Sequence, residues 1–285
     1  MSFAETAALG ALAGFTIFLS LPFARLTSLG SRARVALAMF AVGVLAFLFV
    51  DVLEHGFGIV EHAVEGYKAG ESSLGHAVWL TILLGVGFTV GSAGLGVFEQ
   101  RVSKRRPLPP MAGGSANVVA AGDVALAESA IAASQAWALR TGMTVAAAIG
   151  LHNFAEGLAI GVSAQTGEIG LATVLIIGFA LHNATEGFGI IGPLGGVRPS
   201  WRWLTTVGLI GGAPTFLGAM LGYNVTSQPL ELLFYALAGG AILYVIGEVW
   251  QAMRRVGHRE LGLWLLATGF MAGVVTDMVV VYGGG

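Results

Sequence analysis

The stretch that decides the fold is LHNFAEGLAIGVSAQTGEIGLATVLIIGFALHNATEGFGII, residues 151–191. It begins and ends with two related segments, 151–161 and 181–191, which are identical at six of eleven positions. Each segment places a histidine, an asparagine and a glutamate inside an apolar run. Similar runs recur along all 285 residues, of which 55% are hydrophobic and 11% charged. The sequence therefore predicts an all-α polytopic membrane protein, because about 20 apolar residues suffice to cross a bilayer.

Hydropathy predicts eight transmembrane helices in a single transmembrane domain that covers residues 1–285. Their expected ranges are 5–24, 33–53, 75–98, 141–165, 168–192, 202–223, 230–252 and 260–281. The connection at 99–140 opens with basic residues, continues through a glycine-rich stretch and ends alanine-rich. We expect it to be a cytoplasmic loop that is partly helical near its end.

Basic residues orient these spans, since cytoplasmic segments of membrane proteins are enriched in lysine and arginine. Thirteen of the fourteen basic residues fall on one predicted side, and only Lys68 falls on the other. The thirteen are Arg25, Arg32, Arg34, Arg101, Lys104, Arg105, Arg106, Arg140, Arg198, Arg202, Arg254, Arg255 and Arg259. We therefore expect both termini to be extracytoplasmic, in a protein of the plasma membrane.

The two copies of the polar motif are predicted to meet in the middle of the bilayer. In each copy, histidine and glutamate are four residues apart and so share one helix face. His152 and His182 lie about 12 and 14 residues from the ends of their spans, which at 1.5 Å per residue is near the midplane. The two spans form an antiparallel hairpin, so the motif faces can come together. Asn153 and Asn183, about 100° around the helix, border the same site.

This pattern favours a divalent cation site. Ionised carboxylates are costly within a membrane, and no lysine or arginine lies at the depth of Glu156 or Glu186. Two adjacent carboxylates repel unless they are protonated or bridged by a cation. A single His–Glu pair could instead form an interhelical hydrogen-bond network, but two imidazoles and two carboxylates are typical transition-metal ligands. Because the chain has no cysteine, a metal here would be held by imidazole, carboxylate or amide groups. The predicted site gathers six such residues: His152, Asn153, Glu156, His182, Asn183 and Glu186.

The segments HNFAEG at 152–157 and HNATEG at 182–187 resemble the HNxPEG-type motifs of the ZIP (Zrt-/Irt-like protein) family, and the resemblance covers essentially the whole chain. It implies that one metal is bound centrally by His152, Glu156, His182 and Glu186, and that Asn153 and Asn183 contribute to this site or to an adjacent second site. It also implies a 3+2+3 bundle of eight helices that transports divalent metal into the cytoplasm. The transported ion would be zinc foremost, with iron, manganese, cobalt and cadmium as further candidates. The resemblance also implies elevator-type alternating access, in which spans 1, 4, 5 and 6 slide against spans 2, 3, 7 and 8, often within a homodimer.

The chain departs from the family pattern at the motifs and on the sixth span. Ala155 and Thr185 stand where the family has proline. Ala213 precedes Pro214, where many members have a glutamate that helps bind a second metal. The loop at 99–140 lacks the histidine cluster that is often found there.

Acidic and histidine side chains gather where the second span leads outward. Asp51, Glu54, His55, Glu61 and His62 recur at helical spacing. This segment would concentrate cations at an entrance, although Glu61 to Glu71 could equally be a solvated acidic face. Asp277, near the outer end of the eighth span, is a further candidate. The resemblance likewise implies that acids on spans 2 and 8 mark the entrance.

Glu248, toward the cytoplasmic end of the seventh span, has two interpretations. It can reach water and pair with Arg254 or Arg255, or it can act as a ligand on the exit path.

The alternative function is a membrane-embedded metal or haem redox protein, in which two histidines would bind haem iron axially. Neither the HExxH motif of zinc proteases nor the Glu-x-x-His order of di-iron sites is present. We expect a transporter rather than an enzyme. The divalent metal ion and the lipid bilayer would be its partners, with no prosthetic group and no nucleic acid.

Overall fold

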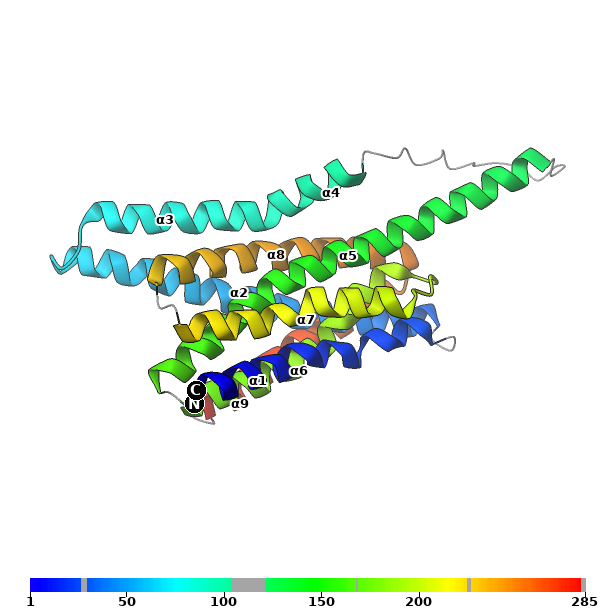
Figure 1. Ribbon diagram of the computed structural model, residues 1–285. Coiled ribbons are helices and arrows are strands. Elements are labelled where there is room, and N and C mark those ends of the chain that lie inside the picture. Colours follow the sequence, from blue (N-terminus) through cyan, green and yellow to red (C-terminus); the bar gives the residue numbers. More distant parts are fainter. Residues whose placement is uncertain (27–29, 104–120, 168, 225–226, 283–285) are drawn as a thin grey trace.

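The computed structural model describes residues 1–26, 30–103, 121–167, 169–224 and 227–282 (Figure 1). The predicted cytoplasmic residues Lys104, Arg105 and Arg106 lie outside the described residues. The described chain is helical, and its long helices run side by side as a bundle (Figure 1). Both termini lie at one end of this bundle, and the segments that lead into and out of residues 104–120 lie at the other.

The elements follow the predicted order. They are α1 (Phe3–Phe15), the 3₁₀ turns η1 (Thr16–Leu19) and η2 (Leu21–Arg25), α2 (Ser31–Lys68), α3 (Leu74–Thr89), the π-helical turn η3 (Val90–Gly94), α4 (Leu95–Ser103), α5 (Ala121–Thr166), α6 (Ile169–Ile191), the 3₁₀ turn η4 (Gly192–Leu194), α7 (Trp201–Asn224), α8 (Gln228–Val256) and α9 (Arg259–Tyr282).

Seven segments in the described part of the chain are long and apolar enough to cross a membrane. They are Phe3–Arg25, Ser31–Lys68, Leu74–Phe98, Glu128–Gln165, Trp201–Asn224, Gln228–Val256 and Arg259–Val279. Helix α6, with 23 residues, coincides with the remaining predicted span at 168–192. The prediction of an all-helical polytopic membrane protein is therefore confirmed.

Two helices extend well beyond the predicted spans. Helix α2 continues past residue 53 to Lys68, because Ile59, Val60 and Ala63 pack against apolar residues of α3 and α8. Helix α5 begins at Ala121, within the predicted loop, and runs unbroken through the first motif. The predicted ranges 33–53 and 141–165 thus lie within longer helices.

Glycines divide the bundle into two groups of closely packed helices. In the first group, a Cβ on Gly14 would overlap the carbonyl oxygen of Gly212, and one on Gly218 would overlap that of Phe154. These contacts join α1 and α5 to α7. In the second group, Gly43 approaches α9, and Gly240 approaches the segment α3–η3 in the same way. Close backbone approach of this kind is typical of small residues in membrane helices.

The two groups are α1, α5, α6 and α7, and α2, α3, α8 and α9. Contacts between them include the rings of Phe154 and Phe234, whose centroids are 4.7 Å apart. The two polar motifs belong to the first group.

Candidate metal centre

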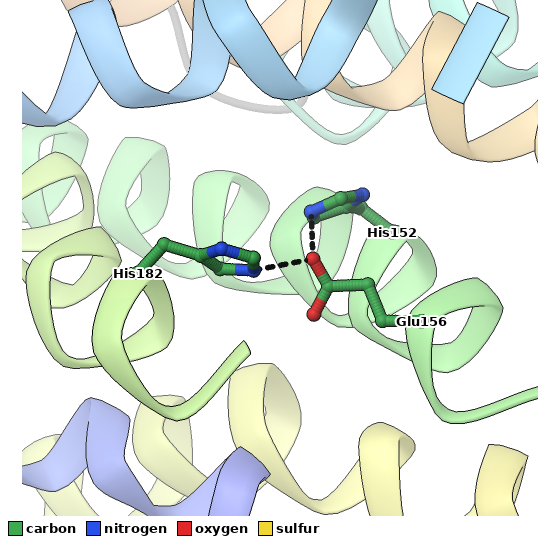
Figure 2. A group of neighbouring side chains, drawn as sticks. All are labelled: His152, Glu156 and His182. Atoms are coloured by element: carbon green, nitrogen blue, oxygen red, sulfur yellow. Dashed lines mark hydrogen bonds and ion pairs between the residues drawn. The ribbon is translucent and has the colours of Figure 1, made fainter. Parts of the chain in front are cut away.

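The two motifs bring three potential ligands together. His152 and Glu156 lie four residues apart on α5, and His182 reaches them from α6 (Figure 2). Oε1 of Glu156 lies 2.9 Å from Nε2 of His152 and 2.6 Å from Nε2 of His182. One ligand atom from each residue can be chosen so that all lie within 4.8 Å of one another. The prediction that the two motif faces meet is thus matched by the geometry.

Glu186 completes the set from the second motif. Its Oε1 lies 3.6 Å from Nε2 of His152. The side chains of His152 and Glu186 are fully buried, Glu156 is 4% exposed and His182 is 10% exposed. Two imidazoles and two carboxylates therefore lie together inside the protein.

Several of these buried polar atoms have no hydrogen-bond partner among the described residues. They include Nδ1 of His152, Oε2 of Glu156, both carboxylate oxygens of Glu186, and Oδ1 of Asn153 and of Asn183. Buried polar groups are ordinarily satisfied, so a group of unpartnered atoms in one place is compatible with a bound ion. Imidazole nitrogens and carboxylate oxygens together suit zinc, iron(II), manganese or cobalt. The donor set fits a divalent transition metal ion.

The two motif asparagines point to neighbouring helices. Nδ2 of Asn153 donates to the carbonyl oxygen of Gly211 on α7, at 3.0 Å. Nδ2 of Asn183 donates to the carbonyl oxygen of Ala13 on α1, at 3.2 Å. Both side chains are fully buried. Sequence analysis grouped the two asparagines with the predicted metal ligands and did not predict their contacts with α7 and α1.

A cavity of about 630 Å³ reaches the three-residue cluster. Its lining includes Glu156 and His182 from the motifs, and four of the predicted entrance residues, Asp51, Glu54, His55 and Asp277. It also includes two residues that sequence reasoning missed, Glu231 and Tyr235 of α8. Glu231 could have been identified from the sequence by the same criterion as Glu54, because each is an acidic residue at the end of an apolar span.

The remaining candidates lie away from this cavity. Glu61 and His62 are exposed on α2 and do not line it, and Nδ1 of His62 is 3.6 Å from Oε2 of Glu65. This arrangement fits the solvated acidic face that the sequence left open. Glu248 is half-buried in α8 and takes part in an interaction.

The departures from the family pattern have simple structural counterparts. Both motif helices stay α-helical where proline is absent, at Ala155 and Thr185. The hydroxyl of Thr185 donates to the carbonyl oxygen of His182 at 2.8 Å, a bond within its own helix. Ala213 brings no carboxylate to α7, and Pro214 lies inside that helix.

The geometry does not suit the haem alternative. A haem iron with two axial histidines needs a flat porphyrin between the two rings. Here the ring centroids of His152 and His182 are 6.5 Å apart, and Oε1 of Glu156 lies between them, within 3 Å of both (Figure 2). A carboxylate occupies the place that a macrocycle would need.

Comparison with known proteins points to one family. Residues 119–246 match the family model described as ZIP Zinc transporter. The chain is also 37% identical over 136 residues to a protein of Myxococcus xanthus described as "Zinc transporter GufA". That match covers 46% of this chain and 53% of the relative, so the chain spans about half the length of the curated protein it matches. Both motifs, the cluster and most of α8 fall within the matched residues. Residues 119–246 of the chain are thus similar to the ZIP zinc transporter family.

Proposed function

We propose that the protein transports divalent transition metal ions, zinc foremost, across the membrane into the cytoplasm. The observation that carries this proposal is the set of unpartnered nitrogen and oxygen atoms on His152, Glu156 and Glu186, beside the large cavity. The similarity of residues 119–246 to the ZIP Zinc transporter family model supports the same conclusion.

The charges along the cavity suggest how an ion would reach the centre. Asp51, Glu54, Glu231 and Asp277 line its wall. Acids in a low-dielectric cleft raise the local concentration of cations. The ion would then exchange its water ligands for Glu156 and His182, the motif residues that line the cavity. His152 and Glu186, which are more deeply buried, would complete the coordination.

The division of the bundle supports elevator-type alternating access. The ligands belong to the group α1, α5, α6 and α7, whose helices are held together by close backbone contacts. The second group, α2, α3, α8 and α9, carries Asp51, Glu231 and Asp277. Sliding of the first group against the second would carry the bound ion across the membrane, and Glu248 on α8 would stand on the exit side. The extracytoplasmic position of both termini, the plasma membrane location and a homodimer belong to the same proposal.

Metal flux tests the function directly. Purified protein in proteoliposomes, with a zinc-sensitive dye inside, should give uptake above that of empty vesicles. Glu156→Ala should abolish the uptake, because it removes the carboxylate that lies near both imidazoles. Glu71→Ala is the control, since Glu71 is exposed in the turn after α2. Wild-type uptake equal to that of empty vesicles, for zinc and for cadmium, would overturn the proposal.

A further inference from the structure

Each copy of the motif also contains a second pair of residues four positions apart, an asparagine and a glycine. In the first copy these are Asn153 and Gly157, and in the second they are Asn183 and Gly187. They are offset by one residue from the His–Glu pair, so they form a neighbouring edge of the same helix. All four residues are buried.

On α5, this edge lies against α7. Asn153 donates to the carbonyl oxygen of Gly211. One turn further along, the carbonyl oxygen of Thr215 comes so close to Gly157 that a Cβ there would overlap it. Gly211 and Thr215 are themselves four residues apart. One turn of α5 therefore matches one turn of α7 at both positions.

On α6, the same edge lies against α1 and its 3₁₀ extension. Asn183 donates to the carbonyl oxygen of Ala13. A Cβ on Gly187 would overlap Oγ of Ser20 and lie 3.0 Å from the carbonyl oxygen of Ile17. Ala13 and Ile17 are again four residues apart. Two unrelated partner helices thus receive the two motif copies in the same way.

The direction of the asparagine bonds follows from chemistry. A backbone carbonyl oxygen can only accept a hydrogen bond, so the side-chain NH₂ must face it. An NH₂ group has no lone pair to offer a cation. The atom that fixes each side chain in place is therefore the nitrogen, whereas Oδ1 of each asparagine is buried and has no hydrogen-bond partner among the described residues.

We propose that each motif has a binding edge and a docking edge. The histidine and glutamate bind the metal, whereas Asn153 and Gly157 dock α5 on α7, and Asn183 and Gly187 dock α6 on α1. The asparagines are positioning residues. They set the rotation and height of the two helices and so hold the adjacent His–Glu pairs within reach of one ion. This inference deepens the proposed function and rests on it for the identity of the ion.

Exchange of asparagine for aspartate separates a positioning role from a ligand role. Asn153→Asp and Asn183→Asp keep the shape and an oxygen but replace the N–H donor with a second acceptor that faces a carbonyl. We expect zinc affinity, measured by isothermal titration, to fall about 10- to 100-fold, as is usual when a partner that orients ligands is lost. Asn224→Asp is the matched control, because Asn224 is exposed and donates within its own helix. Unchanged or tighter binding, or a second equivalent of zinc in the aspartate variants, would overturn the proposal.

The glycine positions provide an independent test on α6. Gly187→Ala should weaken zinc binding about tenfold or more, by the same loss of ligand orientation. Gly189→Ala should leave it unchanged, since nothing lies within 4 Å of a Cβ at that position. The double variant Gly187→Ala with Ser20→Ala should recover much of the loss, because it removes the hydroxyl that the new methyl group meets. No recovery, or equal damage by Gly189→Ala, would contradict a docking edge on α6.

Thermal unfolding of the metal-free protein separates this inference from the proposed function. Docking contacts exist without metal, so Asn183→Asp and Gly187→Ala should lower the melting temperature of the metal-free protein, whereas Asn224→Asp and Gly189→Ala should not. If the wild-type protein fails to bind zinc but the melting temperatures follow this order, the ion has been assigned wrongly and the docking edge stands. If the wild type binds zinc and the order is absent, the docking edge is wrong. A variant that does not fold at all, beside a control that does, supports docking.

Discussion

Replacement of Glu186 by glutamine should stabilise the metal-free protein while it weakens metal binding. Glu186 is fully buried, and both of its carboxylate oxygens lack a hydrogen-bond partner among the described residues. By analogy with aspartate in membrane insertion, the ionised group costs about 3 kcal/mol. A buried amide without partners costs about 2 kcal/mol. Glu186→Gln should therefore stabilise the metal-free protein by about 1 kcal/mol, which corresponds to a rise of roughly 2–4 °C in melting temperature.

The effect on the metal-bound protein should have the opposite sign. Removal of one charge from a buried, compensated set costs about 3 kcal/mol, or roughly a 100-fold loss of zinc affinity. At a zinc concentration about 100 times the wild-type Kd, zinc stabilises the wild type by about 2.7 kcal/mol. The same zinc concentration would only equal the Kd of the variant, and zinc would therefore stabilise the variant by about 0.4 kcal/mol. Zinc should thus raise the melting temperature of the wild type by several degrees and that of the variant hardly at all.

Tryptophan fluorescence during heating, with chelator or with zinc, measures both effects in one preparation, since the chain has six tryptophans. Glu71→Gln, at an exposed position, is the control. The reasoning is refuted if Glu186→Gln keeps the full zinc-dependent shift. It is equally refuted if the metal-free variant melts well below the wild type, because Glu186 would then stabilise the metal-free protein instead of destabilising it.

Three further predictions concern the cavity, the packing and the outer face. Asp51→Asn should slow zinc uptake most at low ionic strength, because the attraction of cations into the cavity is screened by salt; equal slowing at every salt concentration would contradict this. Gly43→Ala should lower the melting temperature, since its Cβ would overlap the carbonyl oxygen of Leu266, whereas Gly58→Ala, with open space around it, should not. Trp79 is exposed on α3, and the chain has no cysteine. If two copies associate through α3, Trp79→Cys should form a disulfide-linked dimer in membranes under oxidation. If no such dimer forms, association through α3 is contradicted.

Much of the architecture could be predicted because it depends on local pattern. Apolar runs marked the spans, and the spacing of four between His152 and Glu156 placed them on one helix face. The end of α2 could not be placed, since Asp51 and Glu54 indicate exit from an apolar span. The helix continues because residues further along pack on α3 and α8. A contact of that kind has no local signature.

The asparagines show a second limit of sequence reasoning. Asn153 directly follows the proposed ligand His152, and an amide oxygen is an acceptable ligand, so sequence analysis grouped Asn153 with the predicted metal site. Its hydrogen-bond partner on Gly211 is 58 residues away, and that of Asn183 on Ala13 is 170 residues away. Which face of α7 or α1 meets each motif depends on helix packing. Periodicity within a single helix therefore could not have identified these partners.

The unbroken length of α5 has a consequence for measurement. The helix has 46 residues and is therefore roughly 70 Å long, more than twice the thickness of the hydrocarbon layer. The proposed metal ligands His152 and Glu156 and the exposed residues near its beginning, such as Ala132, belong to the same continuous helix. A displacement of the site along the membrane normal would move that far end by a similar amount. A spin label or dye at Ala132→Cys would thus report the displacement of the site along the membrane normal, although the site itself lies within the bilayer.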